Sequence, residues 1–353
     1  MRHVVSVLVL SAALAGCSLT VTEDPPDVRE SVETPGGTVV LVTHESFSLP
    51  KPLMRQFERE SGYRLEVRAA GDAGTLTTKL AVTADNPTGD VAFGVDNTFA
   101  SRALDEGVFD VADVELPEGA ADFVVPGDDG ERLVPVDTGN VCVNVDTAWF
   151  AERDLEPPAT LDDLADPAYD GLFVTPSALS SSPGLAFLMT TVAAYGEDWP
   201  AYWEDLLAND AKVVDGWTDA YFTDFTGGSE DGTRPIVLSY DSSPAFTVAK
   251  GGGASTTAAL LDSCFRQVEY AGVLAGADNP EGARALIEFL LGEEVQAALP
   301  ESMYVFPVRD GIALPPDWEA YAERPSEPYV LDPAEIADNR DDWLEQWRDL
   351  VTQ

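Results

Sequence analysis

The order of strand-like and helix-like segments in the first third of the chain constrains its fold more than any other feature. Short apolar or alternating runs are typical of strands, and helical spacing of apolar residues lies between them. The strands are expected at residues 38–43, 63–68 and 90–95, and the helices at 50–61 and 75–82. This order predicts parallel βαβ units within an α/β fold.

The rest of the chain continues the alternation less regularly. Residues 134–145 and 266–274 are β-rich and are expected to cross between two lobes. Other strands are expected at 171–175 and 236–240, and helices at 161–164, 183–195, 279–291 and 333–350. Two α/β lobes joined by crossing strands leave a cleft between them, and α/β folds bind ligands in such clefts.

The first residues are typical of an export signal. A short apolar run, too short for a stable bilayer anchor, ends in Leu14-Ala15-Gly16-Cys17. This ending resembles the bacterial lipobox, in which cleavage leaves a cysteine that carries lipid. We therefore expect a signal peptide at 1–16, lipid on Cys17 and a flexible polar tether at 17–37, on the outer face of the cytoplasmic membrane. An ordinary signal peptide with a chance cysteine is the alternative.

Acidic residues greatly outnumber basic ones. The chain has 63 Asp and Glu against 20 Lys and Arg, a formal net charge of −43. Nucleic acid and anionic membrane surfaces are therefore excluded as expected partners. A cationic solute would be attracted, although salt screens that attraction over about 10 Å. Most of this charge is expected to serve solubility.

Two cysteines remain once Cys17 is assigned to lipid. In an oxidising compartment Cys142 and Cys264 could form a disulfide, which would close a long loop worth about 4–5 kcal/mol in the chain-entropy model. Two buried free thiols are the alternative. The only histidines are His3 and His44, and no Cys/His cluster has metal-ligand spacing, so we expect neither a metal site nor a cofactor.

The chain lacks the motifs of common catalytic sites. It contains no G-x-S-x-G elbow, no P-loop and no G-x-G-x-x-G pattern. A Ser-His-Asp hydrolase would need His44, which lies on an early loop without a local signature. We therefore expect no enzyme, and a lipid-anchored surface enzyme is the alternative from another functional class.

Several loops after expected strands are rich in aromatic, serine and acidic residues, which suits binding groups on a rigid scaffold. These segments resemble the thiamine-binding proteins of bacterial thiamine ABC importers, within a wider class that binds ferric iron, polyamines and sulfate. The matching order runs from about residue 39 to the C-terminus. The most specific segments are Gly216-Trp217-Thr218-Asp219-Ala220-Tyr221, Leu238-Ser239-Tyr240-Asp241-Ser242-Ser243-Pro244-Ala245 and Tyr304-Val305-Phe306-Pro307-Val308.

This resemblance implies a two-lobed, type II periplasmic-binding-protein fold with the ligand cleft between the lobes. We expect lobe 1 to comprise residues 38–137 with 271–310, and lobe 2 to comprise 138–270. The C-terminal helical segment 311–353 is not assigned to a lobe. The partners expected from the family are thiamine or a thiamine phosphate as ligand and an ABC permease in the membrane, with the receptor acting as a monomer.

The resemblance also carries ligand-binding positions. Aromatic rings would enclose thiamine, an acid would read its aminopyrimidine, and serines at a helix start would hold its hydroxyl or phosphate end. The matching residues are Trp217, Tyr240 and Tyr304 for the rings, Asp72 for the acid, and Ser181 and Ser182 for the serines. Tyr304 stands where the family usually has tryptophan; His44 and Phe246 stand where it usually has tyrosine.

Each of these residues also has a structural explanation, namely core packing for the rings and helix capping for Asp72 and the serines. A ferric-iron or polyamine receptor of the same fold is the alternative function. Iron sites of this class often use an adjacent tyrosine pair, whereas Tyr240 is followed by Asp241.

Overall fold

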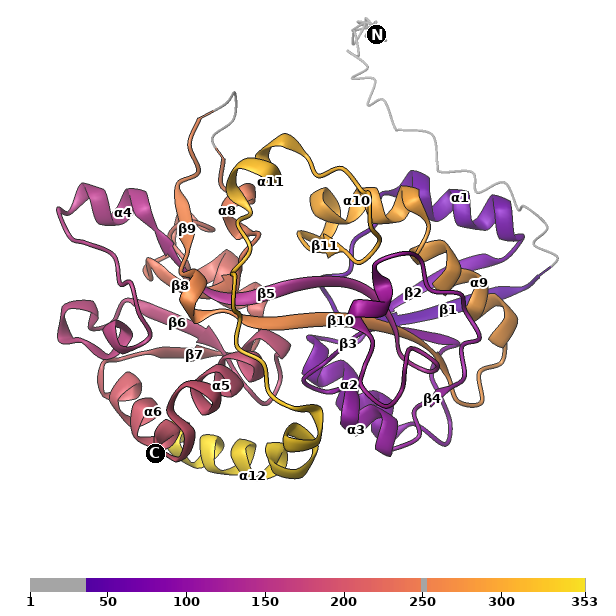
Figure 1. Ribbon diagram of the computed structural model, residues 1–353, viewed down its shortest axis with the longest axis horizontal. Coiled ribbons are helices and arrows are strands. Elements are labelled where there is room, and N and C mark those ends of the chain that lie inside the picture. Colours follow the sequence, from indigo (N-terminus) through magenta and orange to yellow (C-terminus); the bar gives the residue numbers. More distant parts are fainter. Residues whose placement is uncertain (1–35, 249–252, 353) are drawn as a thin grey trace, which may run out of the picture. The chain divides into compact units, whose positions relative to one another are not determined.

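The computed structural model describes residues 36–248 and 253–352, which belong to one compact unit (Figure 1). The expected signal peptide, Cys17 and the tether before Gly36 lie outside the described residues. Within the described ranges, none of the helices combines the length and the apolar character needed to cross a bilayer.

The first third of the chain forms the expected parallel units. Its elements are β1 (Thr38–Thr43), α1 (Lys51–Ser61), β2 (Arg64–Ala69), α2 (Ala73–Val82) and β3 (Val91–Asp96). Strand β1 pairs in parallel with both β2 and β3. Helix α2 begins two residues earlier than expected, because Asp72 caps it by accepting a hydrogen bond from the backbone N–H of Ala73.

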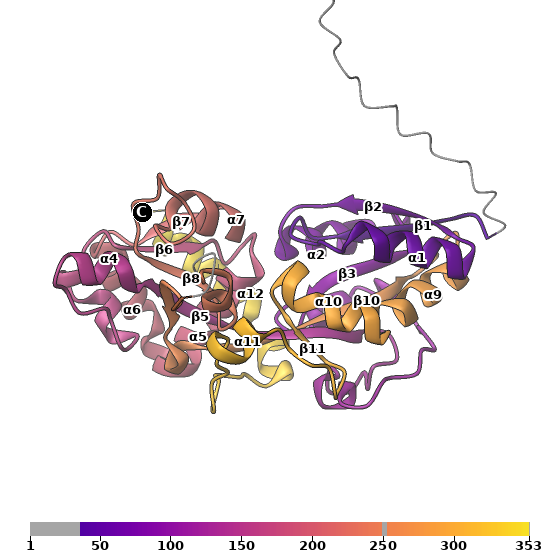
Figure 2. The same cartoon turned by 90° about the horizontal axis from the view of Figure 1, so that it is seen from above.

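Two long strands run between the lobes in the middle of the sheet (Figure 2). They are β5 (Val134–Asp146) and β10 (Phe265–Leu274), which pair antiparallel and place Glu269 opposite Asp137. On its other edge β10 pairs with β3 of the first lobe, and on its other edge β5 pairs with β8 (Ile236–Tyr240) of the second lobe. Every residue of β5 is buried, including the polar residues Asp137, Thr138, Asn140, Asn144 and Asp146.

The second lobe is built on three further strands: β6 (Phe173–Pro176), β7 (Lys212–Val214) and β8 (Ile236–Tyr240). Strand β6 lies parallel between β7 and β8, and the sheet order is β2-β1-β3-β10-β5-β8-β6-β7. Its helices are α4 (Thr147–Glu152), α5 (Ser182–Tyr195), α6 (Trp199–Ala208), α7 (Trp217–Asp219) and α8 (Ser243–Phe246). A π-helical turn, Ala220–Asp224, follows α7.

The remaining elements surround this framework. They are α3 (Ala100–Asp105), β4 (Phe109–Asp110), β9 (Thr257–Ala259), α9 (Pro280–Leu290), α10 (Glu293–Met303), β11 (Phe306–Pro307), α11 (Pro316–Tyr321) and α12 (Pro333–Val351). Short 3-10 turns lie at Ala120–Phe123, Asp162–Ala165, Pro167–Tyr169, Gly196–Asp198 and Leu261–Ser263. The short helix expected at 161–164 is therefore only a 3-10 turn. Helix α6 was not expected.

Helix α12 rests on both lobes, which the sequence left undecided. It contacts α6 of the second lobe and α3 of the first (Figure 1). Its buried face consists of Ile336, Arg340, Trp343 and Trp347. The ring of Trp347 meets that of Trp203 edge-on, with centroids 5.5 Å apart. The same hydrophobic core therefore includes residues of α3, α6 and α12.

A disulfide joins the two crossing strands at the second-lobe end. Cys142, in β5, is bonded to Cys264, which directly precedes β10 and lies 122 residues away in sequence. Both residues are fully buried. The bond ties together the two strands that connect the lobes.

We expect loss of this disulfide to destabilise the fold strongly. Replacing both cysteines, Cys142→Ala with Cys264→Ala, should lower the free energy of unfolding by about 5 kcal/mol, because the closed loop is long. Denaturant unfolding of the two proteins would measure this difference. Thiol titration of the denatured wild-type chain should gain two thiols on reduction, and no gain would contradict the prediction.

Candidate functional site

A cavity lies between the lobes, over the crossing strands. It is lined by loop residues from both sides and by Glu269 of β10. The first lobe contributes His44, Ser46, Asp72, Ala73, Met303, Tyr304 and Val305. The second contributes Ser182, Pro183, Trp217, Tyr221, Phe222, Tyr240, Ser242, Ser243 and Phe246. Several of them follow strand ends or begin helices, such as His44 after β1, Ala73 at the start of α2 and Ser182 at the start of α5, as expected for an α/β cleft.

Aromatic rings form one wall of the cavity. The ring of Trp217 stacks on Tyr221 with centroids 5.2 Å apart and 23° between the planes, and it meets Tyr240 edge-on at 6.2 Å. The indole Nε1–H donates to the hydroxyl of Ser239 at 3.0 Å, which fixes the orientation of the ring. Farther along, Phe246 and Tyr304 meet edge-on at 4.8 Å. The wall is therefore preorganised and electron-rich.

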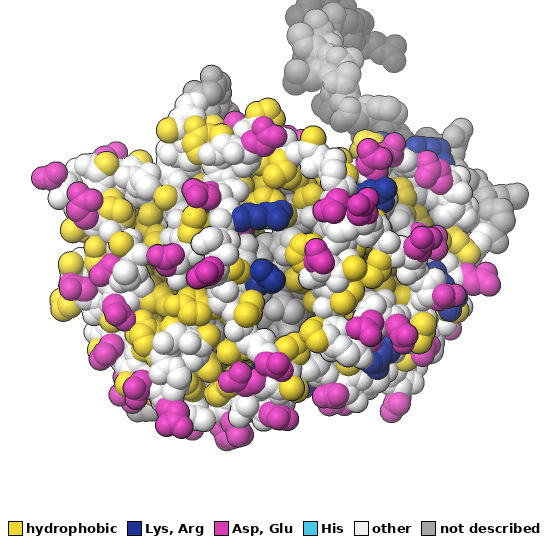
Figure 3. Space-filling view, viewed as in Figure 1, with side chains coloured by type: hydrophobic (Ala, Val, Ile, Leu, Met, Phe, Trp, Pro, Cys, Tyr) yellow, Lys and Arg dark blue, Asp and Glu magenta, His cyan; other side chains and the backbone are white. Residues whose placement is uncertain are grey.

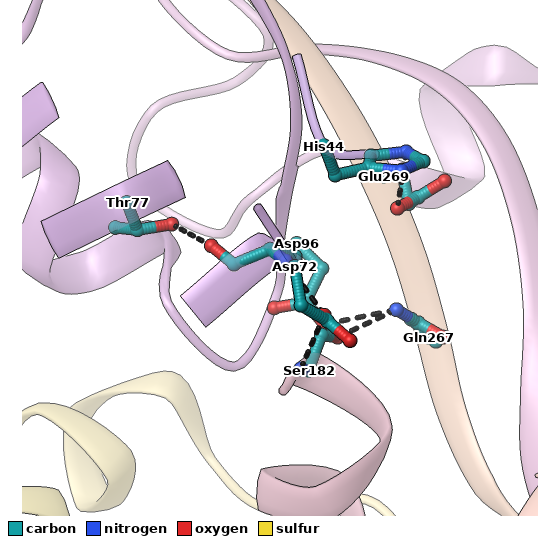
Figure 4. Close-up of polar contacts among 8 residues, drawn as sticks. His44, Asp72, Thr77, Asp96, Ser182, Gln267 and Glu269 are labelled. Atoms are coloured by element: carbon teal, nitrogen blue, oxygen red, sulfur yellow. Dashed lines mark hydrogen bonds and ion pairs between the residues drawn. The ribbon is translucent and has the colours of Figure 1, made fainter. Parts of the chain in front are cut away.

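Histidine 44 and Glu269 form a charged pair at the floor of the cavity (Figure 4). The imidazole Nε2 of His44 lies 3.4 Å from Oε1 of Glu269. Gly94 makes room for this ring: its φ is +100°, and a Cβ there would collide with His44. Burial alone would lower the pKa of His44, but the charge and hydrogen bond of Glu269 and the nearby Asp72 and Glu45 raise it. The imidazolium form is therefore favoured.

A second carboxyl group lies against Glu269 beneath the cavity. Asp137, its partner across β5 and β10, is buried, with 1% of its surface exposed. Burial, together with the negative charge of Glu269, raises the pKa of Asp137 well above its usual value, which favours the protonated form of this buried carboxyl group.

Asp72 connects the two lobes. Besides capping α2 through Ala73 N–H at 2.6 Å, its carboxylate accepts from the backbone N–H of Trp217 at 3.1 Å and of Ser182 at 3.3 Å. The backbone N–H of Thr75 also donates to the carbonyl of Ser180 across the lobes, at 3.2 Å. Hydrogen bonds thus join the two lobes, and two of them are accepted by one carboxylate that lines the cavity.

Asp96 lies close to Asp72 and also holds Ser182 (Figure 4). Its carboxylate accepts from the backbone N–H of Thr98 at 3.0 Å, from the hydroxyl of Ser182 and from Gln267 Nε2 at 3.0 Å. Burial raises the pKa of Asp96 to about 6, although its hydrogen bonds from Ser182 and Thr98 oppose the shift. Asp96 was not among the ligand-binding residues expected from the sequence, and its hydrogen bond from Ser182 joins the two lobes.

Seven of the eight expected ligand-binding residues line the cavity: His44, Asp72, Ser182, Trp217, Tyr240, Phe246 and Tyr304. Ser181 does not. It is the N-cap residue of α5, is fully buried, and its hydroxyl makes no hydrogen bond within the described residues. Its backbone N–H is bonded to the carbonyl of Ser177.

The sequence analysis missed several lining residues, notably Glu269, Tyr221, Phe222 and Ser243. Glu269 did leave a signal, since it is a lone acid within the otherwise apolar crossing strand 268–274. A charge on a buried strand is expensive unless it is paired or functional. Tyr221 and Ser243 lie inside the segments that carried the family resemblance, but nothing distinguished them from core residues.

Comparison with known proteins supports an extracellular binding role. The family of bacterial extracellular solute-binding proteins matches residues 53–326. The thiamine-binding periplasmic protein of Escherichia coli (strain K12) is 28% identical over 321 residues, covering 89% of this chain and 94% of that protein. Iron uptake protein A1 of Synechocystis sp. (strain ATCC 27184 / PCC 6803 / Kazusa) is 24% identical over 338 residues, covering 93% and 90%.

A solved structure of a binding protein resembles this chain in fold. A periplasmic thiamin binding protein superposes with a TM-score of 0.78 at 27% identity, covering 90% of this chain and 96% of that chain. The expected two-lobed type II fold is therefore confirmed.

Asp96 should make the stability of the fold depend on pH. Its pKa is about 6, against 3.8 for an ordinary Asp, so between those values the folded state holds a proton that the unfolded state has released. Its contribution is therefore most favourable below pH 4 and declines as the pH rises to 6, by on the order of 3 kcal/mol in total.

This decline can be measured by urea unfolding at several pH values from 4 to 7. Asp96→Asn, which cannot ionise, should flatten the decline relative to the wild type. Asp205→Asn changes an exposed carboxylate on α6 and serves as the matched control. An identical pH profile for wild type and Asp96→Asn would show that Asp96 is ionised throughout.

Proposed function

The chain belongs to the family of bacterial extracellular solute-binding proteins, and on that premise we propose that it binds thiamine or a thiamine phosphate between its lobes. The aromatic wall beside a carboxylate-containing floor is the observation that carries this proposal. Relatives of known cargo, such as the thiamine-binding periplasmic protein of Escherichia coli, support it.

Thiamine has a flat aminopyrimidine ring and a thiazolium ring with a fixed positive charge. Aromatic faces attract such a cation by about 0.5–2 kcal/mol each. Trp217, Tyr240 and Tyr304 provide such rings at the cavity wall. The carboxylates of Asp72 and Glu269 add negative charge in the same space, which suits a cationic ligand.

Asp72 retains capacity for a ligand. A carboxylate offers about four lone-pair positions. Three are used by the backbone N–H groups of Ala73, Ser182 and Trp217. The remaining position can accept a hydrogen bond from the exocyclic amine of the pyrimidine, so that one residue both closes the lobes and reads the ligand.

The cavity lacks, among the described residues that line it, the adjacent tyrosine pair that iron sites of the related class often use, since Tyr240 is followed by Asp241. Burial, followed by the charges of Glu269 and Asp72, raises the pKa of Tyr240 well above its usual value. A neutral ring keeps its electron-rich face for stacking on a flat cation.

We propose that the binding cycle uses hinge motion about β5 and β10. The ligand would enter an open form, and the hydrogen bonds to Asp72 would form as the lobes close. The proposed lobes are residues 38–137 with 271–310 and residues 138–270, with α12 packed across both. Lipid on Cys17 and the tether 17–37 would hold the receptor, as a monomer, beside its ABC permease.

Thiamine should stabilise the purified protein in a thermal-shift experiment. A ligand that binds only the folded state adds RT ln(1 + [L]/Kd), about 2.7 kcal/mol at a hundredfold excess over Kd. Thiamine, its phosphates, ferric citrate and spermidine would be compared. A response to iron or spermidine without one to thiamine would overturn the proposal.

Replacing Trp217 by alanine should weaken thiamine binding by more than about tenfold, since it removes a ring that stacks on a cation. Trp217→Phe keeps an aromatic face and should lose less. Trp149→Ala removes an indole outside the cavity and is the matched control. Calorimetric titration would compare the affinities, and an unchanged affinity in Trp217→Ala would exclude this ring from the site.

A further inference from the structure

Glu269 is the less compensated of the two carboxylates that line the cavity. Asp72 accepts hydrogen bonds from three backbone N–H groups. The carboxylate of Glu269 accepts none from the backbone within the described residues, and its cationic neighbour is His44, with 3.4 Å between Nε2 and Oε1. A close charge-assisted N–H···O bond is about 2.7–2.9 Å long. Glu269 therefore keeps capacity for a second cation.

The pair of His44 and Glu269 is buried yet faces the cavity (Figure 4). Only 7% of His44 and 8% of Glu269 is exposed. The imidazole also lies against the ring of Phe93, with centroids 5.6 Å apart, and close to Gly94. Salt screens buried charges much less than exposed ones, so a positive charge that enters the cavity acts strongly on both members of the pair.

His44 is the only basic residue among the described residues that line the cavity. Burial lowers the pKa of its imidazole, but the charge and hydrogen bond of Glu269, followed by the charges of Asp72 and Glu45, raise it above the usual 6.5. Three carboxylates thus hold the proton on His44, and a cation among them would oppose it.

Two further acids face Glu269 from the neighbouring strands. Asp137 lies opposite it on β5, and Asp96 lies opposite it on β3. For both, burial is the main cause that raises the pKa, and the charge of Glu269 raises it further. A cation beside Glu269 would lower the pKa of these two groups, in the same direction as that of His44.

We propose that Glu269 is the counter-charge of the thiazolium ring and that His44 releases its proton to the solvent as this ring enters. The inference rests on the proposed thiamine-binding function and deepens it. That function gives the aminopyrimidine to Asp72, which leaves Glu269 as the other carboxylate among the described lining residues. After burial, the charges of Glu269 and Asp72 are the largest causes of the raised pKa of Tyr240. A ligand of two rings beside Tyr240 can therefore present one end to each carboxylate.

The proton release sets the sign of a pH dependence. A bound cation lowers the pKa of His44 below its value in the free protein, so between the two values binding expels a proton. The affinity for thiamine therefore increases as the pH rises through this window and levels off above it. We expect at least about a threefold gain in affinity from pH 6.0 to pH 8.5.

The acidic surface of the protein attracts cations at long range as well. Acidic side chains are spread over both lobes on the face shown in Figure 3, and the net charge of the chain is −43. Salt screens such exposed charges over about 8 Å at 0.15 M ionic strength. Measurement at that ionic strength therefore isolates the groups around the cavity.

The test is calorimetric titration of the full chain at pH 7.0 in buffers of different ionisation enthalpy, which counts the protons released per ligand. Thiamine would be compared with an analogue in which carbon replaces the thiazolium nitrogen, so that the ring keeps its shape without the charge. We expect thiamine to release a fraction of a proton and to gain affinity with pH, and the neutral analogue to do neither. Equal proton release with both ligands would overturn the proposal.

Two substitutions separate the roles of the pair. His44→Gln keeps a polar side chain without a titratable proton and should lower the proton release by at least about half. Glu269→Gln removes the counter-charge and should weaken thiamine binding at pH 8.5 by at least about fivefold, with a smaller loss for the neutral analogue. Glu288→Gln makes the same change on the exposed face of α9, outside the cavity, and should leave both quantities unaltered. A thermal melt of each variant establishes that it is folded.

Failure of this inference differs from failure of the proposed function. Thiamine binding without proton release, at an affinity independent of pH, would overturn the inference and leave the function intact. Proton release that persists in full in folded His44→Gln would exclude His44 as its source. Absence of thiamine binding in the wild type would defeat the proposed function itself.

Discussion

The antiparallel pairing of β5 with β10 is the constraint on which the rest of the structure depends. These buried strands lie in the middle of the sheet. Strand β10 pairs with β3 of the parallel set β2-β1-β3, and β5 pairs with β8 of the parallel set β8-β6-β7. Because both run between the lobes, they fix where the loops of one lobe meet those of the other. They also bring Asp137 and Glu269 together. The proposed hinge and the floor of the cavity are thus formed by the same pair of strands, which the Cys142–Cys264 disulfide joins at one end.

Two aspartate side chains accept hydrogen bonds that join the two lobes. Asp72 accepts hydrogen bonds from the backbone N–H groups of Ser182 and Trp217 in the second lobe. Asp96 accepts a hydrogen bond from the hydroxyl of Ser182, the first residue of α5. Such buried acids cost free energy unless they are hydrogen-bonded, and each of them accepts several donors. Asp72 therefore both joins the lobes and lines the cavity, whereas Asp96 joins the lobes without lining it.

Much of the fold was predictable because it follows local patterns. The apolar periodicity located β1, α1, β2 and β3, and the long β-rich runs located both crossing strands within one or two residues. Helix α6 was missed although its buried residues Trp199, Tyr202, Trp203 and Leu206 recur at helical spacing. Among site residues, the aromatic loops were found through resemblance to a family. Ser181 stays a prediction, although its buried hydroxyl neither lines the cavity nor caps α5.

The sequence by itself determined the alternation of elements, the cysteine pair, the acidic charge and the aromatic loops that suit a flat cation. These depend on local composition and spacing, which a single chain displays directly. Only the tertiary structure decided that Glu269 faces His44, that Asp72 bonds to Trp217, and that Ser182 meets Asp96. Those contacts join residues 86 to 225 positions apart, as the numbering of each pair shows. They exist because the pairing of strands and the packing of the two lobes bring distant segments together, and no local sequence pattern encodes these contacts.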